Sequence, residues 1–262
     1  MLDSTGARRN QQGNNRHSDY GLDCWFSVAR THRGNHRPCN EDAVHCADSN
    51  VWAVADGMGG HDAGDLASQA IVDALADAAP PVTLVDRVDW IEDQLLWVDR
   101  QLHNRAAAMG PGTVIGSTVV SLTVEAATGV VLWAGDSRLY RLRNGQLDLV
   151  TRDHNPIVDL LDVGAVSEEE AMSTDTNVIT RAVGGAKPLD LDVAVFDVAP
   201  DDTLLLCSDG LYRELQEHEL IDVLGLADLD SAADQLVERV LARPARDNLS
   251  LVILRNTSHG GG

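Results

Sequence analysis

The chain has 262 residues and a mass of 28.1 kDa, which fits one large domain. Its formal net charge of −21 and pI near 4.5 would repel nucleic acid and anionic lipid, so we expect it to bind neither. No apolar run approaches the roughly 20 residues of a membrane span, so we expect no membrane association.

The beginning of the chain, residues 1–22, is polar and rich in Asn, Gln, Arg and Gly, without the apolar stretch of a secretory signal. We therefore expect a disordered polar tail, a folded domain over residues 23–256 and a flexible end over residues 257–262. The four cysteines show no Cys-x-x-Cys spacing and three lie in or beside apolar runs, so we expect free thiols in a reducing cytoplasm.

Elements of both kinds are predicted in the first half of the chain. β-Branched and aromatic residues indicate strands at 24–29 and 51–55, separated by a polar loop at 31–40. Apolar residues at three-to-four spacing predict a helix from Asp62 that ends at Pro80 and Pro81. A second helix is predicted from Val85 to Met109, because the same spacing recurs there up to the Gly-Pro-Gly at 110–112.

The second half of the chain begins with closely spaced strands. They are predicted at 117–124, 130–134, 139–142 and 147–150. Short connections such as Asn144-Gly145, a strong hairpin signal, indicate antiparallel pairing. Further elements are predicted as a loop with a short helix at 155–186, a helix start at 167–170, strands at 193–198, 203–207 and 249–254, and a helix at 231–241. These elements predict an α+β domain with antiparallel sheets and helices outside.

Four aspartates far apart in the sequence each follow a strand-like apolar run or sit beside one: Asp56, Asp136, Asp209 and Asp247. Carboxylates suit hard divalent cations, and the carbonyl of Gly57 can supply a further oxygen ligand. Each aspartate alone also fits a turn or a helix cap. Their joint occurrence predicts a site of metal-assisted hydrolysis, if the strands share a rim.

A polar loop adds a phosphate-binding candidate. The guanidinium of Arg37 can hold a phosphate through two hydrogen bonds, although alone it also fits a surface arginine. Glu41 and Asp42 could orient metal-bound waters as outer-shell groups.

The ordered set of motifs resembles the PPM family of metal-dependent Ser/Thr protein phosphatases, also called type 2C, in its compact bacterial form. The resemblance covers about residues 24–256 and rests on short segments that occur in the family's order: Arg37-Pro38-Cys39-Asn40-Glu41-Asp42, Ala55-Asp56-Gly57-Met58-Gly59-Gly60-His61, Gly116-Ser117-Thr118, Gly135-Asp136-Ser137-Arg138, Asp153-His154-Asn155, Asn177-Val178-Ile179-Thr180-Arg181, Ser208-Asp209-Gly210-Leu211 and Arg246-Asp247-Asn248.

The resemblance implies a four-layer α-β-β-α sandwich, two central antiparallel sheets flanked by helices, with Mn²⁺ or Mg²⁺ at one end. By motif, Asp56 would bridge two core ions and the Gly57 carbonyl would bind one of them. Asp209 and Asp247 would complete the other ion's shell, and Asp136 with Asp209 would hold a weaker third ion. Arg37 would bind the substrate phosphate, and residues 155–186 would form a variable flap beside the site.

Two segments depart from the family pattern. Met58 follows Asp-Gly where eukaryotic relatives carry a histidine proposed as general acid, so no protein general acid is assigned. A metal-bound water and His61 stay open as alternative proton donors to the leaving group. The flap reads Ser-Thr-Asp-Thr at 173–176, where many bacterial relatives carry basic residues. The family's substrate preference is therefore not transferred.

The predicted activity is hydrolysis of phosphoserine and phosphothreonine by direct attack of a metal-activated water, without a phosphoenzyme. The expected partners are phosphoprotein substrates and a cognate Ser/Thr kinase, and the expected state is a monomer. Three alternatives remain open: a hydrolase of small phosphoesters, a catalytically silent binding module, and a structural Ca²⁺-binding domain.

Overall fold

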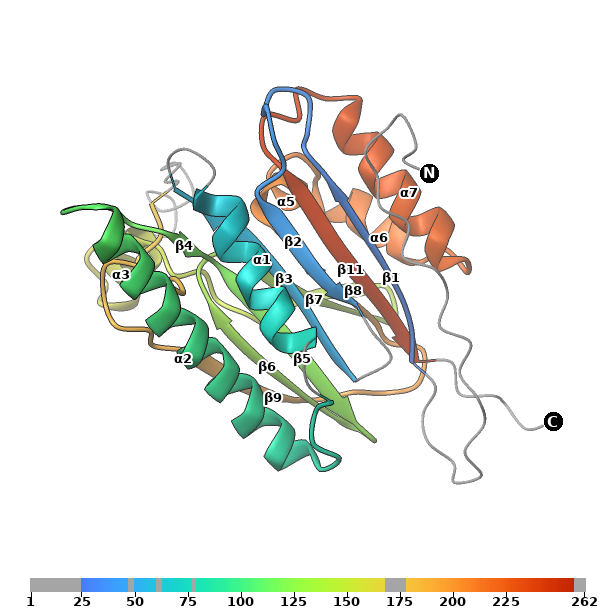
Figure 1. Cartoon of the computed structure of the whole chain (residues 1–262). Helices are drawn as coiled ribbons and strands as arrows, with labels where there is room; N and C mark the ends of the chain where they lie inside the picture. The colour runs from blue at the N-terminus through green and yellow to red at the C-terminus, as the bar shows by residue number, and fades with distance from the viewer. Residues whose placement is uncertain (1–24, 47–49, 60–62, 77–78, 168–177, 257–262) are drawn as a thin grey trace, which may run out of the picture.

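The computed structural model describes residues 25–46, 50–59, 63–76, 79–167 and 178–256. The predictions for residues 1–22, residues 257–262, His61, residues 173–176 and the helix start after Ser167 concern residues outside these ranges. The described part of the chain forms two β-sheets with helices on their outer faces (Figure 1).

Both sheets pair their strands in antiparallel fashion. The five-stranded sheet has the order β1 (Trp25–His32), β11 (Leu249–Asn256), β10 (Thr203–Cys207), β7 (Arg138–Arg143) and β8 (Gln146–Leu149). The six-stranded sheet has the order β2 (Asp42–Cys46), β3 (Val51–Met58), β5 (Val119–Glu125), β6 (Thr128–Ala134) and β9 (Asp192–Asp197), with β4 (Gly116–Ser117) paired to β3.

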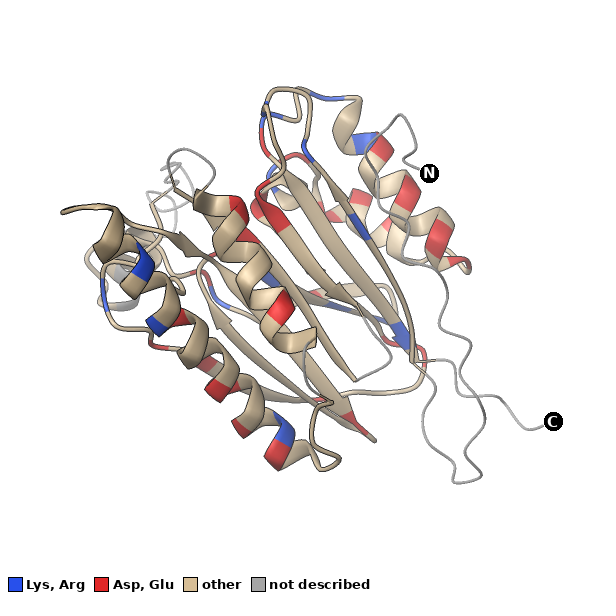
Figure 2. Cartoon of the chain, in the orientation of Figure 1, with Lys and Arg blue, Asp and Glu red and all other residues tan. Residues whose placement is uncertain are grey.

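Helices cover the outer face of each sheet. The six-stranded sheet packs against α1 (Ala63–Ala76) and α2 (Leu84–Met109), and the five-stranded sheet packs against α5 (Asp209–Tyr212), α6 (Glu217–Leu224) and α7 (Leu229–Leu241). The remaining described helix, α3 (Pro156–Asp162), lies in the predicted flap. Many acidic residues lie on the outer helices (Figure 2). This arrangement is the predicted α-β-β-α sandwich.

Strand alternation explains the three apolar layers. In β3, Val51, Ala53 and Ala55 face α1 and α2, whereas Trp52 and Val54 face the other sheet. The same alternation recurs in β10 and β11, whose side chains divide between the layer under α5–α7 and the layer between the sheets. Because both faces are buried, these strands read as continuous apolar runs, and each fully buried Val or Leu contributes about 1.5–3 kcal/mol.

The structure differs from the sequence-based prediction in three elements. No element was predicted where strand β2 and helices α5 and α6 lie, since the predicted polar loop ends at residue 40, before β2 begins. These elements are short, and β2 carries Asp42 and His45 among its apolar residues, so neither length nor periodicity marks them. Packing between longer elements stabilises them, and α6 also has a capping box in which Glu219 accepts from the Gln216 N–H at 2.9 Å.

The predicted run of hairpins is divided between the two sheets. Strands β5 and β6 pair in one sheet, β7 and β8 pair in the other, and the chain crosses at Gly135, Asp136 and Ser137. Gly135 has φ +114°, and a Cβ atom there would lie 2.6 Å from the side chain of Thr118. Only glycine therefore allows this crossing.

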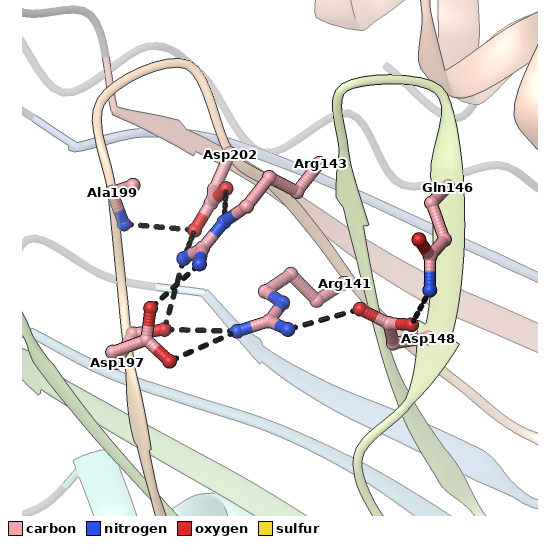
Figure 3. Close-up of polar contacts among 7 residues, drawn as sticks. All are labelled: Arg141, Arg143, Gln146, Asp148, Asp197, Ala199 and Asp202. Carbon is pink, nitrogen blue, oxygen red and sulfur yellow. Dashed lines mark hydrogen bonds and ion pairs between the residues drawn. The ribbon is translucent and has the colours of Figure 1, made fainter.

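An arginine–aspartate cluster joins the two sheets at one end (Figure 3). Arg143 on β7 donates to both carboxylate oxygens of the fully buried Asp202, each at 2.7 Å, and to Asp197 on β9 at 2.6 Å. Arg141 pairs with Asp148 at 2.9 Å and with Asp197 at 3.4 Å. Asp197 belongs to the six-stranded sheet and Arg143 to the five-stranded sheet, so this cluster links the two sheets directly.

Candidate active site

Antiparallel register brings the predicted aspartates to the opposite end of the sandwich from that cluster. Asp42 on β2 is the Cα partner of Asp56 on β3. Arg138 pairs with Cys207 across β7 and β10, so Asp136 and Asp209, each two residues outward, lie next to each other. Asp247 precedes β11, which pairs with the same β10. The shared rim expected from the sequence is therefore present.

Asp56 is held by backbone bonds at the end of β3. Its N–H donates to the hydroxyl of Thr118 at 3.1 Å, and its carbonyl accepts from the Thr118 N–H at 2.9 Å and the Ser117 hydroxyl at 3.0 Å. Gly57 donates to the Glu41 carbonyl at 3.1 Å, and a Cβ atom on Gly57 would lie 2.2 Å from the Gly64 carbonyl. Glycine is thus required where β3 meets the first turn of α1.

Asp136 and Asp209 share one arginine. Arg213, which follows α5, lies 3.1 Å from the Asp209 carboxylate and 3.3 Å from the Asp136 carboxylate. The Tyr212 hydroxyl donates to the Asp136 carbonyl at 3.0 Å. Sequence analysis missed Arg213, although its spacing of four residues from Asp209 on a helical turn would have suggested the ion pair.

Arg37 and Asp247 also meet directly. The Arg37 Nη2 atom lies 2.8 Å from Asp247 Oδ2, and the Arg37 side chain is 46% exposed. Asn248 fixes this region, because its side chain accepts from the Glu41 N–H at 2.8 Å and donates to the carbonyls of Arg33 and Cys39. The arginine predicted to bind phosphate therefore lies beside a predicted metal ligand.

Glu41 and Asp42 hold the rim together. The Glu41 carbonyl accepts from the Ser68 hydroxyl on α1 at 2.6 Å. Asp42 Oδ2 accepts from the Ser208 hydroxyl at 2.8 Å, and that hydroxyl accepts from the Ser250 N–H at 2.9 Å. These contacts connect β2, β10 and β11, and the positioning by Ser208 was not predicted.

His154 braces the crossing that carries Asp136. The Gly135 N–H donates to His154 Nδ1 at 3.1 Å, so the other ring nitrogen donates to the Asp192 carboxylate, also at 3.1 Å. The imidazole stacks on Trp133 with ring centroids 5.9 Å apart. The sequence motif contained His154, but no role was predicted for it.

Burial and mutual repulsion dominate the electrostatics of this rim. Burial and the charge of Asp136 raise the pKa of Asp209 to about 6, and burial, with the charges of Asp209 and Asp247, raises the pKa of Asp42 to about 7. The pKa of Asp56 is raised well above the usual range, first by burial and then by the carboxylates of Asp42, Asp209, Asp136 and Asp247. The rim therefore favours cations.

The donor set fits hard divalent cations, since the converging side-chain donors are carboxylate oxygens. The buried oxygens Asp42 Oδ1 and Asp209 Oδ1 have no hydrogen-bond partner, which is unfavourable unless a cation offsets their charge. Within the described ranges, no three Asp, Glu, His or Cys side chains already surround one point. Arg37 and Arg213 bind three of the carboxylates instead.

Comparison with known proteins identifies the class. The protein phosphatase 2C family model matches residues 28–252. The serine/threonine phosphatase Stp of Listeria welshimeri is 33% identical over 243 residues, which cover 88% of this chain and 96% of that protein. The chain therefore belongs to the protein phosphatase 2C family, which confirms the resemblance and the predicted enzyme class.

Solved structures agree with this assignment. PppA, described as a key regulatory component of T6SS in Pseudomonas aeruginosa, is 38% identical with a TM-score of 0.83, over 90% of this chain and 99% of that chain. The catalytic domain of the phosphatase PstP, solved with two manganese ions, is 29% identical with a TM-score of 0.78, over 90% of this chain and 100% of that chain. The predicted fold is confirmed.

None of the helices in the described part of the chain is both long enough and apolar enough to cross a bilayer.

Proposed function

We propose that this enzyme hydrolyses phosphoserine and phosphothreonine in proteins with two Mn²⁺ or Mg²⁺ ions, in opposition to a cognate Ser/Thr kinase. Asp56, the Gly57 carbonyl, Asp209 and Asp247 would hold the two ions, and Asp136 with Asp209 would hold a weaker third. The observation that supports this best is the convergence of carboxylates around Asp56, whose pKa is raised first by burial and then by its four carboxylate neighbours. The two manganese ions of the related PstP structure support it independently.

The chain's own residues would bind and orient the substrate. Arg37 is half-exposed beside Asp247, so its guanidinium can receive a phosphate from solvent through a bidentate contact. Arg213 can offset charge near Asp136 and Asp209. Glu41 and Asp42 would act as outer-shell groups, Asp42 being held by Ser208. Bound divalent cations would supply the acidification of water and the neutralisation of phosphate charge.

Met58 has no proton to transfer, so its position supplies no general acid.

We further propose a cytoplasmic monomer, a single phosphatase domain over residues 23–256 and a flap at 155–186. Phosphoproteins are favoured over small phosphoesters because the curated Stp and PstP relatives are named as serine/threonine phosphatases. Comparing rates on a phosphopeptide and on free phosphoserine separates these two candidates.

The proposal is tested by hydrolysis of p-nitrophenyl phosphate with Mn²⁺, with EDTA, and with Asp209→Asn. We expect Mn²⁺-dependent turnover that EDTA and the substitution both abolish. Asp93→Asn, an exposed site on α2, is the matched control and should behave like the wild type. Turnover that survives both EDTA and Asp209→Asn would refute the mechanism.

A further inference from the structure

A cavity of about 510 Å³ lies beside the carboxylate rim, within the size range of ligand-binding sites. The lining includes Met58, the residue after Gly57, and residues from the stretch 179–190, which begins in the predicted flap and continues past its end. Met58, Ile179 and Pro188 make part of the lining apolar, and a methionine adapts to side chains of different shape. The cavity can therefore accommodate the part of a substrate polypeptide that flanks a residue bound at the carboxylate rim.

The two cationic side chains that line the cavity, Arg181 and Lys187, differ in their ion pairs. The Arg181 guanidinium is engaged by Asp192 at 2.6 Å and by Asp190 at 3.3 Å. Lys187 is exposed, and no carboxylate of the described residues lies within 4 Å of it. Its ammonium is thus the uncompensated cation of the cavity.

This cation is unusual for the chain. Lys187 is the only lysine in a sequence with a net charge of −21. The overall charge repels an acidic peptide at long range, whereas a local cation attracts an anionic side chain once the peptide is bound. Lys187 puts a positive charge at the edge of a site that is otherwise negatively charged, so it can discriminate among substrates by the charge of their flanking residues.

We propose that this cavity is a substrate subsite in which Lys187 binds an anionic side chain next to the phosphorylated residue, either a carboxylate or a second phosphate. The inference rests on the proposed function and names its substrate class: phosphoproteins with acidic or multiply phosphorylated flanks. Arg181, held by two aspartates, would keep the cavity wall in place rather than bind the substrate.

The test compares kcat/KM on three phosphothreonine peptides that differ only in their flanks: glutamine, glutamate, or a second phosphoserine. For the wild type we expect a two- to fivefold preference for glutamate over glutamine, the range of an exposed ion pair, and at least as much for phosphoserine. The preference should fall toward one at high salt. Preference for either anionic flank supports the subsite. The ratio of kcat/KM between the phosphoserine and glutamate peptides shows whether the subsite favours a second phosphate or a carboxylate.

Substitutions locate the effect. Lys187→Glu should invert the preference and Lys187→Arg should retain it, whereas Arg100→Glu on α2, with the same change in charge, should behave like the wild type. Equal kcat/KM for all three peptides, or the same inversion in Arg100→Glu, would overturn the subsite.

If the wild type fails to hydrolyse p-nitrophenyl phosphate, the proposed function fails first. Peptide binding by fluorescence anisotropy then decides the subsite alone, and equal affinities overturn it.

Discussion

Both ends of the sandwich carry aspartates and arginines, but the pKa values of the aspartates shift in opposite directions at the two ends. At the end shown in Figure 3, each aspartate meets an arginine: Asp148 and Asp197 are hydrogen-bonded by Arg141 and Arg143. Hydrogen bonds from these arginines hold the pKa of Asp148 and of Asp197 below the usual range. At the other end, burial and neighbouring carboxylates raise the pKa of Asp42 and Asp209.

This difference separates a structural role from a functional one. Paired carboxylates favour the folded state without any ligand, whereas buried carboxylates that repel one another oppose it until a cation binds. A site that destabilises the fold by itself is expected where function requires it. Substitutions at the two ends should therefore affect stability and activity in opposite ways.

The largest expected effect is on activity at the carboxylate rim. Asp56→Asn should lower kcat with Mn²⁺ by about 1,000-fold or more, equivalent to about 4 kcal/mol, because it removes the most central charge of the proposed metal site. Hydrolysis of p-nitrophenyl phosphate measures this change. Asp148→Asn at the other end should keep kcat within about twofold of the wild type. An equal loss of kcat in that variant would contradict the proposed difference between the two ends.

The next effect is on stability at the paired end. Asp202→Asn should lower the free energy of unfolding by about 2–3 kcal/mol, since the buried carboxylate accepts two bonds from Arg143 and one from the Ala199 N–H. Urea denaturation measures it, with activity per folded molecule unchanged. Unchanged stability, or a selective loss of activity, would contradict a purely structural role.

A smaller effect of opposite sign is expected at the rim without metal. In EDTA, Asp209→Asn should raise the free energy of unfolding by about 1 kcal/mol, because one of several repelling charges is removed. In Mn²⁺ the wild type should gain more thermal stability than the variant does. A destabilised variant in EDTA would show that the Arg213 ion pair outweighs the repulsion.

A further expected effect is a pH dependence of stability whose sign differs between the two ends. The folded pKa values of Asp42, about 7, and Asp209, about 6, lie above their unfolded value of 3.8, so in EDTA stability should rise as the pH falls from 8 toward 5. Asp148 and Asp197 have depressed pKa values, so their contribution is present above pH 3.8 and is lost as the pH falls through the folded values.

Urea midpoints between pH 3 and pH 8 in EDTA measure this curve, whose maximum should lie between about pH 4 and pH 6. Saturating Mn²⁺ should abolish the rise between pH 8 and pH 6, because cation binding favours the ionised carboxylates. A rise that persists in Mn²⁺ would mean that other groups cause it.

Much of the fold could be predicted from the sequence, because long elements carry a periodic signal. The helices ending at Ala76 and Met109 and the strands ending at Cys207 and Asn256 agree with the predicted segments to within a few residues. Their apolar runs and glycine or proline boundaries are local properties of the chain. The aspartates at strand ends were found in the same way, and their metal-binding roles stay predictions.

Other features depended on contacts between distant segments. Nothing local in the sequence distinguishes a hairpin within one sheet from the crossing at Gly135, since the close approach of Thr118 decides it. The cation that serves each carboxylate is likewise a matter of packing: Arg143 reaches Asp202, Arg213 reaches Asp136, and Lys187 reaches no carboxylate in the described residues. Sequence determined which chemical groups the chain carries and which segments extend or coil, because those preferences act over a few residues. Only the tertiary structure decided which charges are neutralised, because pairing depends on distances that register and layer packing set.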